Sequence, residues 1–148
     1  MKHQSGVESQ IAELKKRFTS GTIEYDDAAS NWTRLVRSEF RKYGLKTYGI
    51  YIIRNRESRT ILYIGMAGTL DDSGQFKDQD LMGRLTNTRA KSTPANAWFR
   101  SLIKDHGPIC VEYIILNIPV ETPSSIKESL LAAFVDEHKS RPTAMLPD

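Results

Sequence analysis

Apolar residues recur at steps of three and four positions in two segments near the N-terminus. This spacing is typical of one face of an amphipathic helix. In residues 7–18 the repeating positions are Val7, Ile11, Leu14 and Phe18. In residues 27–43 they are Trp32, Leu35, Val36, Phe40 and Tyr43. Thr-Ser-Gly-Thr at 19–22 separates the segments, and Gly44 is a suitable stop for the second. The pattern therefore predicts two N-terminal helices.

Two short apolar runs, residues 48–53 and 61–65, follow these segments. Both are dominated by β-branched and aromatic residues, and a polar stretch at 54–59 divides them. Residues of these types fit the pleated, half-buried surface of a strand. Two such runs around a polar turn predict a β-hairpin.

The second half of the chain alternates between helical and extended patterns. Residues 66–79 are polar, contain glycine and have no periodicity, which predicts a long loop. Helices are expected from Asp80, from residues 92–94 and over 124–138, with a buried third strand at 109–118. The expected fold class is α/β of the α+β type, in which helices flank a small central three-stranded antiparallel sheet.

The composition is that of a soluble globular protein. The chain has 148 residues, of which 39% are hydrophobic and 26% charged, enough for one compact core. No stretch reaches the roughly 20 apolar residues of a membrane span, and the polar N-terminus lacks a signal-peptide core. A cytoplasmic protein without a membrane partner is expected. The single cysteine, Cys110, lies in an apolar run and should be buried as a small hydrophobe.

Positive charge is concentrated in the middle of the chain. Residues 31–104 hold fourteen Lys and Arg against six Asp and Glu, whereas the whole chain has a net charge of only +3. A cationic face of this kind suits a polyanion, because phosphate contacts release condensed counterions. The alternative is a solvated surface. The arginines of residues 27–43 could also follow a DNA backbone.

Two strings in the hairpin have a recognisable form. They are Gly49-Ile50-Tyr51 and Tyr63-Ile64-Gly65, with eleven residues between the tyrosines. This arrangement resembles the GIY-YIG nuclease family, metal-dependent enzymes that hydrolyse DNA phosphodiester bonds. The resemblance covers about residues 47–142. It implies a GIY-YIG endonuclease-like domain over 47–148, preceded by a helical extension over 1–46.

The resemblance also implies a set of catalytic residues. Tyr51 and Tyr63 would serve the attacking water, Arg84 would bind the scissile phosphate, and Glu128 would hold one Mg²⁺ or Mn²⁺ ion. All four should then share a cleft. Arg89 is an alternative to Arg84. Glu128 has a structural alternative, because Ser125 and Glu128 have the spacing of a capping box.

Basic residues around this set are candidates for contacts with substrate DNA. They are Lys77, Arg89, Lys91 and Lys127. A monomer is favoured, with the apolar residues of the N-terminal helices packed on the domain, and a homodimer through the same residues is the alternative.

One departure from the family pattern supports a second functional hypothesis. Many members have an asparagine after a proline beyond the glutamate helix, whereas residues 141–148 contain none. The alternative function is therefore a catalytically weak or inactive nucleic-acid-binding module on the same scaffold. A third hypothesis is a globular adaptor in which the two strings are coincidental.

Overall fold

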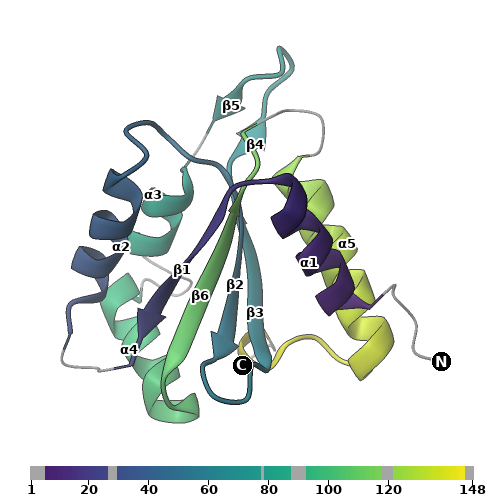
Figure 1. Cartoon of the computed structure of the whole chain (residues 1–148). Coiled ribbons are helices and arrows are strands. Elements are labelled where there is room, and N and C mark those ends of the chain that lie inside the picture. The colour runs from purple at the N-terminus through teal and green to yellow at the C-terminus, as the bar shows by residue number, and fades with distance from the viewer. Residues whose placement is uncertain (1–5, 27–29, 78, 88–92, 118–121, 146–148) are drawn as a thin grey trace.

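The computed structural model describes residues 6–26, 30–77, 79–87, 93–117 and 122–145. It is a mixed α+β fold in which a four-stranded antiparallel sheet lies between two layers of helices (Figure 1). The elements in chain order are α1 (Val7–Arg17), β1 (Ser20–Tyr25), α2 (Trp32–Arg41), β2 (Gly49–Asn55), β3 (Ile61–Ala67), β4 (Thr69–Leu70), β5 (Phe76–Lys77), α3 (Leu81–Thr86), α4 (Ala95–His106), β6 (Ile109–Ile115), α5 (Pro123–His138) and the 3₁₀ turn η2 (Thr143–Met145).

The strand order in the sheet is β1-β6-β2-β3, and each neighbouring pair is antiparallel. The expected hairpin is confirmed as β2 and β3, and the expected third strand is confirmed as β6. The expectation of three strands is wrong, because β1 pairs with β6 along the far edge. Ile23 and Tyr25 are buried in β1, whereas Thr22 and Glu24 are exposed. Buried apolar and exposed polar side chains therefore alternate along this strand, as its sequence does.

Each face of the sheet has its own helical layer and its own hydrophobic core (Figure 1). Helices α2, α3 and α4 cover one face, and α1 and α5 cover the other. The small hairpin of β4 and β5 projects from one end of the sheet, in a stretch that the sequence predicted to be a long loop.

The described residues of the N-terminal segment 1–46 are part of this same architecture. Strand β1 is hydrogen-bonded into the sheet, α1 packs on α5, and α2 packs on α3 and α4. Trp32 is fully buried and Phe40 nearly so, which confirms that the apolar residues of α2 pack within the chain. The segment that was expected to precede the sheet therefore contributes to both helical layers and to one edge of the sheet.

The second helix begins later than predicted, although its first apolar position is its first helical residue. Its N-cap is Asn31, whose side-chain oxygen accepts a hydrogen bond from the Arg34 amide at 3.1 Å. This bond satisfies one of the unpaired amides of the first helical turn. The helix consequently starts at Trp32 rather than near residue 27.

Candidate active site

The register of the hairpin places both motif tyrosines on one face of the sheet. Tyr51 pairs with Gly65, and Ile53 pairs with Tyr63. Residues that pair across strands share a face, so Tyr51 and Tyr63 both lie beneath α2, α3 and α4. Their rings are stacked, with centroids 5.8 Å apart and planes 11° from parallel.

Two glycines make room for aromatic rings on this face. The register aligns Gly21, Tyr113, Tyr51 and Gly65 in one row across the four strands. The ring of Tyr51 lies over Gly65 and that of Tyr113 lies over Gly21, and a Cβ at either glycine would overlap the ring. The glycine of the second string therefore has a direct packing role, which is to accommodate the tyrosine of the first.

We expect Gly65→Ala to displace the Tyr51 ring and to lower the free energy of unfolding by about 1–3 kcal/mol, the usual cost of overpacking. Urea denaturation measures this cost. The matched control is the same substitution in a Tyr51→Leu background, where the clash is relieved and the cost should be smaller. An equal cost in both backgrounds would show that the ring is not the obstacle.

Arg84 lies on α3, over the same face as the tyrosines. The Asp80 carboxylate caps this short helix by accepting a hydrogen bond from the Gly83 amide at 3.0 Å. The Leu81 amide donates to the Thr47 carbonyl at 2.7 Å, just ahead of β2. Because Leu81 is buried in the core that contains Tyr51, these contacts fix the position of the helix. Arg84 itself is half-buried.

The two tyrosines differ in exposure. Tyr51 is fully buried, whereas Tyr63 is half-buried and meets the edge of Trp98 at a centroid distance of 5.5 Å. Tyr63 is therefore the phenol closer to solvent. Trp98 lies on α4, the helix expected from residues 92–94, and its contact with Tyr63 depends on the tertiary packing rather than on a local pattern.

Glu128 has no capping role. The N-cap of α5 is Thr122, whose hydroxyl oxygen accepts a hydrogen bond from the Ser125 amide at 3.0 Å, and Pro123 occupies the first turn. The capping box between Ser125 and Glu128, the structural alternative for Glu128, is therefore not formed. Glu128 is exposed, and it has no hydrogen bond or ion pair within the described part of the chain.

Helix α5 approaches the sheet from the face opposite the tyrosines. Its buried residues Ile126, Leu130 and Phe134 belong to the core that α1 covers. The structure thus brings Tyr51, Tyr63 and Arg84 to one face and places Glu128 on the other helical layer. Helix α5 packs on the edge strand β3 and on β2, so the sheet lies between the helix that carries Glu128 and the face that carries the tyrosines.

The other candidate contacts with DNA are dispersed. Lys77 is exposed on β5 in the projecting hairpin, and Lys127 is half-buried on α5. Arg89 and Lys91 lie outside the residues that the structure describes. Among the described residues, no group of three or more His, Cys, Asp and Glu is arranged to hold a metal ion.

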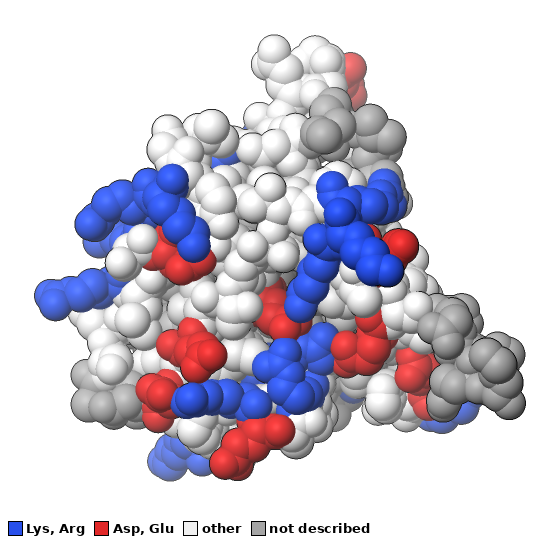
Figure 2. Space-filling model, viewed as in Figure 1, with Lys and Arg blue, Asp and Glu red and all other residues white. Residues whose placement is uncertain are grey.

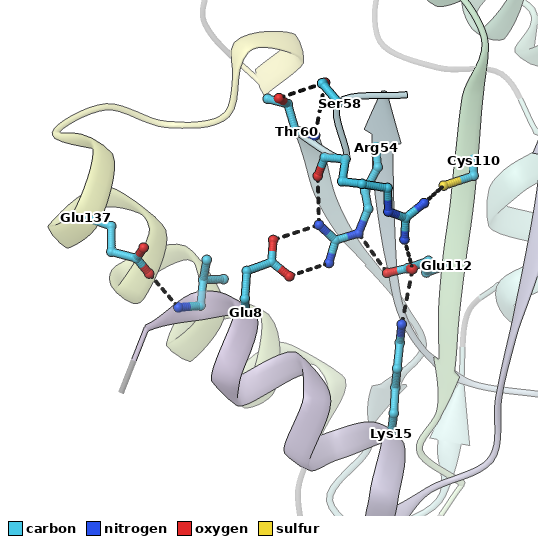
Figure 3. Close-up of polar contacts among 10 residues, drawn as sticks. Glu8, Lys15, Arg54, Ser58, Thr60, Cys110, Glu112 and Glu137 are labelled. Carbon is cyan, nitrogen blue, oxygen red and sulfur yellow. Dashed lines mark hydrogen bonds and ion pairs between the residues drawn. The ribbon is translucent and has the colours of Figure 1, made fainter. Parts of the chain in front are cut away.

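A buried ion cluster, which the sequence analysis did not single out, lies on the α1 side of the sheet (Figure 3). Glu112 of β6 is only 3% exposed and accepts from Arg54 Nε at 2.9 Å, Arg59 Nη2 at 2.6 Å and Lys15 Nζ at 3.1 Å. Arg54, also buried, binds the Glu8 carboxylate through both terminal nitrogens at 2.7 Å. The signal in the sequence was a lone acid within an apolar strand.

The cluster keeps its members charged. Burial alone would raise the pKa of the Glu112 carboxyl. The hydrogen bonds from Arg54 and Lys15 have a larger effect in the opposite direction, so the pKa of Glu112 lies below its ordinary value. Burial likewise opposes the charge on Arg54, whereas the hydrogen bonds to Glu8 and Glu112 raise its pKa overall. Cys110 is buried as expected, and its sulfur lies 3.0 Å from Arg59 Nη1.

These ion pairs change the interpretation of the basic middle segment. Arg54 and Arg59 form ion pairs within the cluster, and Arg56 pairs with Asp26 at 2.7 Å. Figure 2 shows acidic and basic side chains interspersed at the lower end of the molecule, and basic side chains along the left margin, over α2. The positive charge that remains unpaired is therefore partly on α2.

The described helices include none that is long and apolar enough to cross a membrane. Comparison with known proteins finds no matching family model, no similar curated protein and no similar solved structure.

Proposed function

We propose that the protein is a metal-dependent endonuclease that hydrolyses DNA phosphodiester bonds. The observation that carries this proposal is the stacked pair of Tyr51 and Tyr63 beneath the helix of Arg84. Two phenols and a guanidinium on one face can hold a water and a phosphate next to each other. Together with the two strings, this placement supports the resemblance to the GIY-YIG nucleases.

The exposure of each residue suggests its role. Tyr63 is the phenol that can reach a water, and the buried Tyr51 stacks against its ring and holds it in place. Arg84 can donate two parallel hydrogen bonds to phosphate oxygens. These bonds strengthen as negative charge accumulates on the phosphate in the transition state.

Glu128 is the candidate metal ligand, acting from the β3 edge. Glu128 is exposed and has no partner among the described residues, and a carboxylate is a hard oxygen ligand of the kind that suits Mg²⁺ or Mn²⁺, ions that often take one or two carboxylates and several waters. Such an ion, when bound, would lower the pKa of a bound water and neutralise phosphate charge. Lys127, the next residue on α5, could contact the DNA backbone.

Two observations favour the second candidate, a nucleic-acid-binding module with weak or no catalysis. Tyr51 is completely buried, and Glu128 lies on the helical layer across the sheet from the tyrosines. On this alternative the scaffold would bind DNA and leave the phosphodiester bond intact.

A plasmid-nicking assay in Mg²⁺, in Mn²⁺ and in EDTA distinguishes the two. We expect the wild-type protein to nick only with metal, and Glu128→Gln to abolish nicking because it removes the metal-binding charge. Tyr63→Phe should slow nicking by about 10²–10⁴-fold, the usual contribution of a general acid or base.

Two variants serve as matched controls. Asp136→Asn removes another exposed carboxylate of α5, and Tyr48→Phe removes the hydroxyl of a half-buried tyrosine that stacks on Phe76 outside the site. Both should nick at the wild-type rate. Wild-type rates for Glu128→Gln and Tyr63→Phe would refute the proposed site, and metal-independent binding without nicking would favour the second candidate.

A further inference from the structure

Three arginines form a row along the outer side of α2. Arg34, Arg37 and Arg41 are exposed, and at 100° per residue they fall within a sector of about 60° on the helix. The opposite side carries the buried Trp32, Val36 and Phe40. We call these three arginines the α2 arginine row. It extends about 10 Å along the helix axis, at 1.5 Å per residue.

The α2 arginine row differs from Arg54, Arg56 and Arg59 in having no acidic partner among the described residues. None of its three guanidinium groups makes an ion pair within the described part of the chain, whereas Arg54, Arg56 and Arg59 all do. Exposed charges without internal partners contribute little to the fold. Their charge is therefore available to a ligand.

The row borders a hollow that offers hydrogen-bond donors. The hollow has a volume of about 670 Å³ and is lined by Asn31, Thr33, Arg34, Arg37, Ser38, Arg41 and Asn96. The side-chain oxygens of both asparagines are already occupied: Asn31 caps α2, and Asn96 accepts from the Thr33 amide and hydroxyl at 3.1 and 3.2 Å. Their amide nitrogens remain as donors, alongside the guanidinium groups.

We infer that the α2 arginine row is a binding surface for the phosphate backbone of double-stranded DNA. Phosphate oxygens are acceptors, so they complement a lining made of donors and positive charge. The lining contains no aromatic side chain. Single-strand binding surfaces use aromatic rings to stack exposed bases, so a hollow without them favours contact with the backbone of a duplex.

The surface belongs to the same helical layer as Arg84. Trp32 stacks on Phe99 of α4 at 4.0 Å, and its indole nitrogen donates to the Leu85 carbonyl of α3 at 2.8 Å. The row is thus rigidly joined to the helix that carries the candidate phosphate ligand. The inference concerns binding alone, so it does not depend on whether the tyrosine site is catalytic.

The test is the salt dependence of DNA binding in EDTA, where no cleavage occurs. The probe is a fluorescent 20-base-pair duplex of arbitrary sequence, titrated with the full chain between 50 and 200 mM NaCl. The variant is Arg34→Gln/Arg37→Gln/Arg41→Gln. The matched control, Lys16→Gln/Arg17→Gln/Arg141→Gln, removes the same charge from exposed positions on and around the other helical layer.

A plot of log K against log salt has a negative slope, and each phosphate contact adds about 0.9 to its magnitude. Losing three contacts should therefore make the slope less steep by about 2.7. Over this salt range the wild type should therefore lose about 40-fold more affinity than the α2 variant. The control should keep a slope near that of the wild type, and melting curves should show that both variants fold.

Three results would overturn the inference. They are an α2 variant with the wild-type slope, a control that loses as much as the α2 variant, and a wild-type protein that does not bind the duplex. Tighter binding of a single strand of the same length, with the same dependence on the three arginines, would overturn the assignment to duplex DNA. Failure of nicking with an intact α2 effect would count against the nuclease proposal only.

Discussion

Arg84→Ala is expected to lower the rate of DNA nicking by about 10²–10³-fold while weakening DNA binding only modestly. Its hydrogen bonds are strongest when charge has built up on the phosphate, so removing the donor affects the transition state more than the bound substrate. Nicking under single-turnover conditions measures the rate, and fluorescence anisotropy in EDTA measures the binding.

Arg84→Lys refines the same test. Lysine keeps the charge but cannot form two parallel hydrogen bonds, so this variant should bind DNA like the wild type and still nick slowly. The control is Arg100→Ala, an exposed arginine on α4 in the same helical layer. If Arg84→Lys nicks at the wild-type rate, positive charge alone is sufficient and the two-bond role is wrong.

The elements that the sequence predicted well are those with a strong local pattern. The helix at 7–17 has a three- and four-residue periodicity, and the strands around Tyr51 and Tyr63 are short apolar runs; both patterns can be recognised within a dozen residues. Strand β1 was missed because it is short and begins with Ser20-Gly21, which reads as a turn. It becomes a strand because β6 offers it a partner 84 to 94 residues further along the chain, a contact that no local pattern encodes.

The candidate site could be predicted only in part, for a similar reason. The common face of Tyr51 and Tyr63 follows from hairpin register, since a shift of one residue would reverse every side chain. The position of Glu128 depends on which face of the sheet α5 covers, and an apolar stripe does not specify this. The stacking of Tyr51 over Gly65 likewise depends on cross-strand pairing rather than on the spacing of the strings.

Glu112 shows the limit of local patterns most clearly. In the sequence it is one charged residue in an apolar strand, and its partners Arg54 and Lys15 are 58 and 97 positions away. The cluster forms because β2 pairs with β6 in the sheet and α1 covers the face from which Arg54 and Glu112 project. The contribution of Glu112 to stability therefore cannot be inferred from the sequence without the fold.

Glu112→Ala is expected to lower the free energy of unfolding by about 3–5 kcal/mol, because it leaves the buried Arg54 charge without one of its two carboxylates. Urea denaturation near neutral pH measures the loss. The matched control is Glu24→Ala on β1, an exposed glutamate 3.3 Å from Arg56, where an ion pair contributes at most about 1 kcal/mol. Similar losses for the two variants would contradict a special role for the buried cluster.

The same cluster predicts how stability depends on pH. The pKa of Glu112 is lower in the folded protein than in the unfolded chain, so its stabilisation is complete above the ordinary glutamate pKa of about 4.3 and is lost as pH falls towards the folded value. The stability difference between the wild type and Glu112→Gln, which cannot titrate at this position, should therefore be constant from about pH 6 to 7 and shrink below about pH 4.3. Urea denaturation across this range provides the measurement. A difference that stays constant down to pH 3 would mean that the Glu112 carboxylate does not carry the stabilisation, because its protonation would then have no effect on the folded state.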